Sequence, residues 1–273
     1  MTAQQLFIEI KKILKNSNIE NYQQESDILF ENIVGEHRLQ IAVSKNIDTA
    51  ICDTVIAMAK KRANHYPLQY ICKKWQFMNI ELLIGEGVLI PRSDTEIVVE
   101  YALEKIKNIE KPIVLDLCSG SGAIALSIKN ELPHSNVTAI ELYDEAFKYL
   151  KLNAKNDITI LKENVFTYQD KIPNLTFDLI ISNPPYVTKQ EMEDIQQELL
   201  YEPRTALTDE EDGLNFYKHI SKYYYNKIKI GGYLVFEIGA NQGESVKNIL
   251  QQLNYKDIAI YKDYASLNRC VIA

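Results

Sequence analysis

The sequence predicts an α/β protein with a mostly parallel β-sheet, preceded by a small domain of helices. After residue 112, short apolar strands alternate with helical segments, which is typical of a parallel sheet covered by helices on both faces. A glycine-rich loop joins the first of these strands to its helix. The first 64 residues have helical periodicity and a single glycine, Gly35.

Length and composition are those of an ordinary globular protein. The chain has 273 residues, of which 46% are hydrophobic and 25% are charged. This length accommodates one large domain or two smaller ones. The formal net charge of −7 argues against a protein that grips bare nucleic acid, because phosphate neutralisation requires a local excess of basic residues.

Cysteines and histidines predict neither disulfides nor a metal site. The four cysteines are scattered without a Cys-x-x-Cys pair, and the four histidines lack metal-ligand spacing. No apolar run approaches the roughly 18 residues of a membrane span, and the N-terminus has no basic segment followed by an apolar core. We therefore expect a cytoplasmic protein with reduced thiols.

Residues 1–70 are predicted to form the helical domain. Apolar residues from Leu6 to Leu14 follow helical spacing, a second group spans Asp27 to Val34, and a third helix begins at the N-cap Asp48. Pro67-Leu-Gln-Tyr70 is expected to end the helices. Acidic and basic residues balance here, so the domain is either a stabilising cap or a substrate-recognition module.

Residues 71–90 are predicted to form a β-hairpin that links this domain to the next. Apolar residues alternate from Trp75 to Ile84 and indicate the first arm. The turn is expected at Gly85-Glu-Gly87, and the second arm at Val88–Ile90.

The larger domain is predicted to span residues 91–273. Its first helix follows Pro91-Arg-Ser-Asp-Thr-Glu96, where a proline precedes a cluster of capping residues. Further helices are expected at Ala123–Lys129, Glu145–Asn156 and Asn215–Lys227. Strands are expected at Ile113–Leu117, Asn136–Ile140, Ile158–Leu161, Phe177–Ser182, Tyr233–Ile238, Ile258–Tyr261 and Arg269–Ile272.

The loop after the first strand of this domain is a candidate cofactor site. Gly120 and Gly122 allow a tight turn and close approach to a ligand. Their spacing to Ala125 also fits the dinucleotide fingerprint, so a nicotinamide cofactor is an alternative. Asp116 favours S-adenosylmethionine (AdoMet), because a carboxylate suits its ammonium and sulfonium and repels a pyrophosphate. The other interpretation of Asp116 is a cap of the loop.

Two further residues at strand ends point to ligand binding. Glu141 ends the second strand, and its carboxylate can accept both ribose hydroxyls of either cofactor. Asn183-Pro-Pro-Tyr186 follows a buried strand, and two prolines make the chain leave the sheet in a stiff, extended conformation. Asn183 is therefore held at the sheet edge where open α/β sheets bind ligands. Its rigid carboxamide suits an amide or a nucleobase; the alternative is a proline-rich turn.

A series of short motifs occurs in a fixed order along the chain. The motifs are Pro67-Leu-Gln-Tyr70, Val88-Leu-Ile-Pro-Arg-Ser-Asp-Thr-Glu96, Asn183-Pro-Pro-Tyr186, Tyr201-Glu-Pro203 with Ala206-Leu207, Asp212-Gly-Leu214 and Glu237-Ile-Gly239. This series resembles the HemK/PrmC family, the release-factor glutamine N5-methyltransferases. The resemblance implies a class I AdoMet-methyltransferase fold, with a Rossmann-like, mixed but mostly parallel seven-stranded sheet and an N-terminal helical bundle.

The resemblance also implies the reaction. AdoMet would donate a methyl group to the side-chain amide nitrogen of the glutamine in the Gly-Gly-Gln motif of class 1 peptide chain release factors, leaving S-adenosylhomocysteine. The side-chain oxygen of Asn183 and the carbonyl of Pro184 would hold the amide N–H groups. Tyr186 would pack on the amide or exclude water, and Pro185 would complete the acceptor site. No general base is required before transfer.

The predicted cofactor site departs from the family pattern in places. Its residues are Asp116, Cys118, Ser119, Gly120, Ser121, Gly122, Glu141, Asn164, Val165 and Asn183. Cys118 and Ser119 stand where the family usually has Gly-Thr, and Glu141 replaces the commoner Asp. Asn164 occupies the place of an acidic residue that commonly meets the adenine amino group, and Val165 a place where an aromatic is sometimes found.

The alternative activity is methylation of an exocyclic amine on DNA adenine or ribosomal RNA guanine, with the same motif acting on a flipped-out base. The acidic balance of the chain and the neutral helical domain disfavour it. A nicotinamide oxidoreductase or a nucleotide-binding protein has no need of Asn183-Pro-Pro-Tyr186. We therefore expect release factors as protein partners, without direct binding to nucleic acid or membranes.

Overall fold

A computed structural model describes residues 1–273, which form two compact units. The first unit comprises Met1–Lys74 and Gln196–Tyr201, and the second comprises Trp75–Ile195 and Glu202–Ala273. The predicted domain boundaries stay predictions. The sequence contains no pattern that assigns Gln196–Tyr201, far along the chain, to the helical unit.

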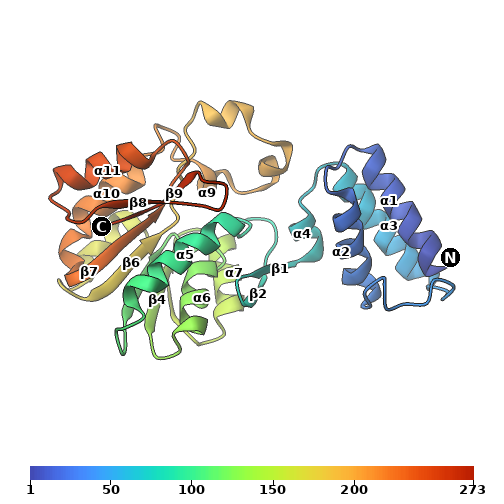
Figure 1. Cartoon of the computed structure of the whole chain (residues 1–273), viewed down its shortest axis with the longest axis horizontal. Coiled ribbons are helices and arrows are strands. Elements are labelled where there is room, and N and C mark those ends of the chain that lie inside the picture. Colours follow the sequence, from blue (N-terminus) through green and yellow to red (C-terminus); the bar gives the residue numbers. More distant parts are fainter. The chain divides into compact units, whose positions relative to one another are not determined.

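The first unit is built on the helices α1 (Ala3–Asn16), α2 (Tyr22–Val34) and α3 (Thr49–Ala63) (Figure 1). Leu6, Ile10 and Leu14 of α1 are fully buried, as their helical spacing predicts. The Asp48 carboxylate accepts a hydrogen bond of 2.8 Å from the Ala50 N–H, which confirms the predicted N-cap. These three helices confirm the helical prediction for the start of the chain.

The prediction that Pro67 ends the helices is wrong. Pro67 instead stands at the N-cap of the short helix α4 (Leu68–Cys72). A proline is tolerated at the start of a helix, because the first N–H groups of a helix have no intrahelical partner.

Arg62 of α3 makes a buried ion-pair network within the first unit. Only 5% of the residue is exposed. Its guanidinium donates to both carboxylate oxygens of Glu25, at 2.5 and 3.0 Å, and lies 2.7 Å from a carboxylate oxygen of Glu198. Because Glu198 belongs to Gln196–Tyr201, this network helps to hold that segment in the first unit.

We expect Arg62→Ala to lower the free energy of unfolding by about 3 kcal/mol, since it leaves the carboxylate of Glu25, whose side chain is 14% exposed, without its partner. Urea unfolding measures the change. Arg38→Ala is the control, because the Arg38–Asp27 pair is partly exposed and contributes about 1 kcal/mol or less. Equal losses in the two variants would contradict the assignment of a buried network.

The predicted hairpin is present, but its turn lies elsewhere. It consists of β1 (Lys74–Phe77) and β2 (Ile80–Leu83), so the second arm predicted at Val88–Ile90 is wrong. A turn does lie at Gly85-Glu-Gly87, where the Val88 N–H donates to the Gly85 carbonyl at 3.4 Å, but it does not join the two arms. Met78 in the actual turn has a φ of 47°, and its N–H donates to the Glu96 carboxylate at 2.8 Å. Methionine rarely adopts this backbone conformation, and the hydrogen bond to Glu96 helps to hold it. The turn therefore forms without a glycine that would mark it in the sequence.

The second unit is organised around a seven-stranded sheet of order β5-β4-β3-β6-β7-β9-β8 (Figure 1). Its strands are β3 (Ile113–Leu117), β4 (Asn136–Glu141), β5 (Thr159–Lys162), β6 (Phe177–Ser182), β7 (Ile228–Glu237), β8 (Ala259–Lys262) and β9 (Asn268–Ile272). In this order, the neighbouring strands from β5 to β7 pair in parallel, and β9 is antiparallel to β7 and β8. This arrangement confirms the predicted mixed, mostly parallel sheet.

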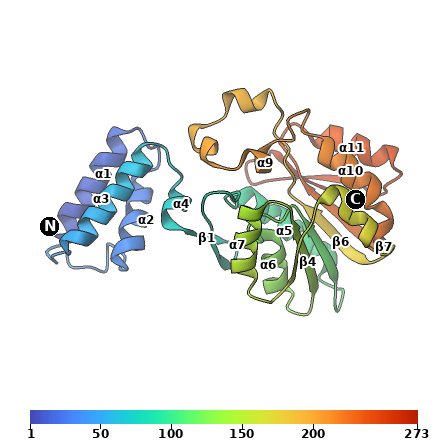
Figure 2. The ribbon, with the colours of Figure 1, turned by 180° about the vertical axis from the view of Figure 1, so that it is seen from behind.

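Helices cover both faces of this sheet (Figures 1 and 2). One face carries α5 (Ser93–Ile106), α6 (Ala123–Glu131) and α7 (Asp144–Ala154); the other carries α8 (Val165–Tyr168), α10 (Asn215–Tyr223) and α11 (Gly243–Gln252). We did not predict α11, although Val246 and Leu250 are buried at helical spacing. No helix of the chain is long and apolar enough to span a membrane.

The register of the central strands brings their last residues together. Leu117 at the end of β3 pairs with Ile140 of β4 on one side and with Ser182 of β6 on the other. The Ser182 hydroxyl also donates to the Leu117 carbonyl at 2.8 Å. The segments that follow Leu117, Ile140 and Ser182 therefore lie at the same edge of the sheet.

Candidate active site

A cavity of about 290 Å³ opens at the carboxyl ends of β3, β4 and β6. The glycine-rich loop after β3, Glu141 at the end of β4 and Asn183 after β6 all line it. The register of the strands places these three together, as the prediction of one ligand site at this edge requires. The wall is completed by residues near Arg92 and by the start of α8.

The glycine-rich loop wraps tightly around the end of β3. The Ser119 N–H donates to the Ile140 carbonyl at 3.0 Å, and the Gly122 N–H donates to the Ser119 carbonyl at 2.8 Å. Gly122 has a φ of 88°, and a Cβ there would lie 2.8 Å from a methyl group of Leu150. Glycine is therefore required at this position for both its conformation and its close packing. Cys118, Ser119, Gly120 and Ser121 line the cavity, whereas Gly122 does not.

Glu141 is tied to the backbone at the end of β4. Its Oε1 accepts from the N–H groups of Leu142 and Tyr143 at 2.7 and 2.9 Å, and its Oε2 accepts from Gly120 at 2.9 Å. Burial raises the pKa of Glu141, and these hydrogen bonds oppose that shift. A carboxylate offers about four acceptor positions. One therefore remains on Oε2, next to the loop, for a ligand hydroxyl.

Asn183 is the only residue of Asn183-Pro-Pro-Tyr186 that both has a polar side chain and lines the cavity. Its Nδ2 donates to the Thr95 hydroxyl oxygen at 3.3 Å. Thr95 and Pro185 also line the cavity, but Pro184 and Tyr186 do not. The contacts predicted for Pro184 and Tyr186 with an acceptor stay predictions.

Family comparisons agree with this geometry. A model described as PrmC N-terminal domain matches residues 5–72, and one described as Methyltransferase small domain matches residues 95–214. A release factor glutamine methyltransferase of Fusobacterium nucleatum is 39% identical over 98% of this chain and 77% of its own length. The chain belongs to the release factor glutamine methyltransferase family. This confirms the resemblance inferred from the motif series.

Other matches are consistent with this family. A release factor glutamine methyltransferase of Clostridium acetobutylicum is 32% identical over 100% of this chain and 98% of its own length. Among solved structures, the hMettl16 catalytic domain in complex with the MAT2A 3′UTR hairpin 1 aligns with a TM-score of 0.54 at 14% identity. That alignment covers 86% of this chain and 83% of the solved chain, and it supports the fold alone.

In this family member, Asp116 caps the helix that follows the loop. It is fully buried on β3 and does not line the cavity. Its Oδ2 accepts from the Ala125 N–H at 3.2 Å, which corresponds to the alternative interpretation of a cap. Its Oδ1 is buried without a hydrogen-bond partner, and burial raises the pKa of Asp116 to about 7. A role toward the ammonium of AdoMet stays a prediction.

The predicted adenine residues Asn164 and Val165 both line the cavity. Asn164 is the N-cap of α8, because its side-chain oxygen accepts from the Phe166 N–H at 2.9 Å. Phe166 itself lines the cavity and packs against Phe216, with ring centroids 4.9 Å apart. The family sometimes has an aromatic where Val165 stands, whereas the aromatic in this cavity wall is Phe166, which was not predicted. Only the turn into α8 determines that the Phe166 side chain lines the cavity.

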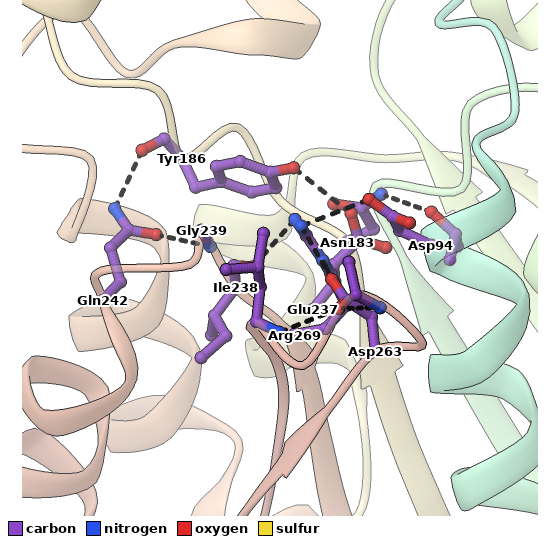
Figure 3. Close-up of polar contacts among 12 residues, drawn as sticks. Asp94, Asn183, Tyr186, Glu237, Ile238, Gly239, Gln242, Asp263 and Arg269 are labelled. Atoms are coloured by element: carbon purple, nitrogen blue, oxygen red, sulfur yellow. Dashed lines mark hydrogen bonds and ion pairs between the residues drawn. The ribbon is translucent and has the colours of Figure 1, made fainter.

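A polar network that was not predicted from the sequence lies beside Asn183 (Figure 3). Glu237, at the end of β7, has 1% of its surface exposed, and its Oε1 accepts from the Tyr186 hydroxyl at 3.3 Å. Arg269 of β9 lies 3.2 Å from Asp94 and 3.1 Å from Asp263. Glu237 belongs to a motif of the family series, but only the tertiary structure shows what it contacts.

The loop after β6 is anchored by Gln242 (Figure 3). Its Nε2 donates to the Tyr186 carbonyl at 2.9 Å, and its Oε1 accepts from the Gly239 N–H at 3.0 Å. Gly213, with a φ of 70°, lies so close that a Cβ would stand 2.2 Å from the Tyr186 carbonyl oxygen. These contacts hold Tyr186 in place from the side opposite to Glu237.

The Glu237 carboxyl is expected to make stability depend on pH. Burial raises its pKa from 4.5 to about 7, and this shift is opposed by the Thr95 hydroxyl, Arg269 and Tyr186. Because the folded state binds this proton more tightly than the unfolded state, the associated stability is present below pH about 4.5 and is lost as the pH rises through about 7.

We expect Glu237→Gln, which does not titrate, to gain about 1–3 kcal/mol relative to the wild type between pH about 4.5 and about 7.5. Urea unfolding of both proteins across this range measures the difference. A difference that stays constant with pH would show that Glu237 has an unshifted pKa.

Proposed function

We propose that the protein transfers a methyl group from AdoMet to the side-chain amide nitrogen of the glutamine in the Gly-Gly-Gln motif of class 1 release factors. The observation that carries this proposal is the single cavity shared by Asn183, the Gly120 loop and Glu141. Relatives that span nearly the whole chain are named release factor glutamine methyltransferases, which supports the same reaction.

The residues present fit AdoMet. The loop at Ser119 to Ser121 lets the backbone approach a ligand closely, and the remaining acceptor position of Glu141 suits a ribose hydroxyl. Phe166, with Asn164 and Val165, forms a wall suited to the adenine ring. When bound, AdoMet supplies a methyl group activated by the sulfonium.

Asn183 performs the central task on the acceptor side. An amide nitrogen is a poor nucleophile, because resonance delocalises its lone pair, the same resonance that gives a rotation barrier of about 18–20 kcal/mol. The Asn183 Oδ1 and the Pro184 carbonyl accept the two N–H groups of the glutamine and aim its nitrogen at the methyl group. Such positioning contributes on the order of 7–11 kcal/mol. The proton becomes acidic only after transfer, so no base is needed beforehand.

The helical domain, residues 1–70, is proposed to recognise the release factor. A model described as PrmC N-terminal domain matches residues 5–72, so this domain is itself a feature of the family. Its balanced charges favour a protein partner over a polyanion.

Methylation of a nucleobase amine is the less favoured alternative. The likeness to an RNA-bound catalytic domain is at 14% identity and concerns the fold, whereas the relatives at 39% and 32% identity are named for release factor glutamine. The formal net charge of −7 also disfavours a nucleic-acid substrate.

The deciding experiment offers release factor, ribosomal RNA and DNA in parallel with methyl-labelled AdoMet. We expect label in the release factor alone, and mass spectrometry of its peptides should place one methyl group on the Gly-Gly-Gln glutamine. A release factor with that glutamine replaced by asparagine is the control and should stay unlabelled. Label in either nucleic acid with an unlabelled release factor would overturn the proposal.

A further inference from the structure

We infer that Arg92 binds the carboxylate in the methionine portion of AdoMet, and that Glu202 is the positioning residue that holds Arg92 for this task. The inference rests on the proposed function and deepens it by naming the group that receives the charged end of the cofactor. The carboxylate of Glu141 suits a ribose hydroxyl and the wall at Phe166 suits adenine, but neither of them matches a ligand carboxylate.

Arg92 is the single basic residue in the cavity wall, which also contains two acidic residues, Glu141 and Glu163. Glu141 accepts from backbone N–H groups, and Glu163 pairs with Lys171 at 2.7 Å. A carboxylate that leaves water for such a cavity requires a cation or several hydrogen-bond donors. The planar fork of a guanidinium matches a carboxylate in both charge and geometry. Arg92 is therefore the residue of this wall that complements the carboxylate of AdoMet.

The order of the strands places the methionine portion near Asn183. Neighbouring strands follow the order β5, β4, β3 and β6. The wall at Phe166 follows β5, Glu141 ends β4, and Asn183 follows β6. A cofactor with its adenine at Phe166 and its ribose at Glu141 therefore extends past the loop after β3 toward β6. The methyl group must also meet the acceptor nitrogen that Asn183 is proposed to hold, so the sulfonium and the methionine portion belong at this end of the cavity.

Arg92 lies at the same end of the cavity. The Asn183 Nδ2 donates to the Thr95 hydroxyl oxygen at 3.3 Å, and the Thr95 N–H donates to the Arg92 carbonyl at 3.1 Å. All three residues line the cavity. The side chain of Arg92 is 35% exposed, so a ligand can reach its guanidinium.

Glu202 holds this guanidinium from the protein side. Its side chain is 1% exposed and does not line the cavity. Its Oε2 accepts from the Ile90 N–H at 2.9 Å, and its Oε1 accepts from Nη2 of Arg92. This is the one hydrogen bond that the Arg92 guanidinium donates within the protein, and a guanidinium has five N–H donors. The remaining donors are available to a carboxylate in the cavity.

Two ligands that differ only in the carboxylate test the role of Arg92. They are S-adenosylhomocysteine and its decarboxylated form, which keeps the adenine, the ribose and the ammonium. Calorimetry should show that the wild type binds S-adenosylhomocysteine at least about tenfold more tightly than the decarboxylated form. This ratio of dissociation constants is the carboxylate preference.

The double variant Arg92→Gln with Glu202→Gln removes both charges, because Arg92→Gln alone would leave a buried carboxylate without its partner. We expect its carboxylate preference to fall to about threefold or less. Its affinity for the decarboxylated form should stay within about threefold of wild type, which shows that the cavity is still formed.

Arg204→Gln is the matched control. Arg204 is an exposed arginine that pairs with Glu210 and does not line the cavity. Its carboxylate preference should stay within about twofold of wild type.

Two substitutions at Glu202 test its positioning role. Glu202→Gln keeps an oxygen that accepts from Arg92, so the carboxylate preference should stay within about threefold of wild type. Glu202→Leu removes that acceptor, and the preference should fall at least about fivefold while the decarboxylated form still binds. Equal preferences in these two variants would refute the positioning role.

The role of Arg92 would be overturned by a wild type without the carboxylate preference, or by a double variant that keeps it. Equal losses of affinity for the two ligands in the double variant would overturn it as well, because they indicate a damaged cavity. If the wild type fails to methylate release factor, the proposed function falls, and the carboxylate preference still decides this inference because it is measured without an acceptor.

Discussion

Asn183→Ala is expected to reduce methyl transfer to release factor by at least about 10³-fold while leaving the AdoMet dissociation constant within about twofold. The substitution removes the acceptor that we propose positions the glutamine nitrogen, and positioning contributes on the order of 7–11 kcal/mol to such reactions. Asn183 follows β6 at the sheet edge, whereas the predicted AdoMet contacts come mainly from the segments after β3, β4 and β5. Loss of rate without loss of cofactor affinity is therefore the expected pattern.

Turnover of labelled AdoMet under saturating release factor measures the rate, and calorimetry measures AdoMet binding. Asn130→Ala is the matched control, because Asn130 is an exposed residue of α6 that does not line the cavity. It should retain wild-type turnover. Turnover within tenfold of wild type in Asn183→Ala would remove Asn183 from the catalytic role.

Glu141→Ala is expected to weaken AdoMet binding by about 10- to 150-fold. A hydrogen bond to a charged acceptor contributes about 1.5–3 kcal/mol, and the variant would lose the proposed ribose contact. It also releases the N–H groups of Gly120, Leu142 and Tyr143 that shape the end of β4 and the loop. Calorimetry gives the dissociation constant directly, and turnover at saturating AdoMet should recover in large part.

Glu163→Gln is the control for loss of negative charge in the same cavity. The Glu163 carboxylate pairs with Lys171 at 2.7 Å instead of with the backbone of the loop. Its AdoMet dissociation constant should stay within about threefold of wild type. An unchanged dissociation constant in Glu141→Ala would show that Glu141 shapes the loop without binding the cofactor.

Asn183 and Glu141, the residues changed in these two variants, lie at an edge of the sheet that could be predicted from the sequence. The buried run Phe177–Ser182 is confirmed as β6, and Ile113–Leu117 as β3. These strands are largely apolar, and loops with glycines or prolines follow them, so both their positions and their ends are visible in a single sequence. The loop at Gly120 and the carboxamide of Asn183 follow directly from those ends.

Contacts between residues distant in the chain could not be predicted in this way. The hairpin turn at Met78 depends on the carboxylate of Glu96, and the segment Gln196–Tyr201 packs with the helical unit in part through Arg62. Neither position carries a glycine, a proline or a periodic pattern that indicates its partner. Such contacts depend on how the helices and strands are arranged in the folded protein, and the local sequence does not indicate them.

Hydrophobic periodicity and backbone constraints are local properties, so the fold class, the strands that form the site and the residues that follow them could be predicted from the sequence. Only the tertiary structure decided that Asp116 caps a helix and that Phe166 faces the cavity. It also decided that Thr95 accepts a hydrogen bond from Asn183 and that Glu237 accepts one from Tyr186. The physical reason is that hydrogen-bond direction and burial depend on neighbours brought together from separate elements.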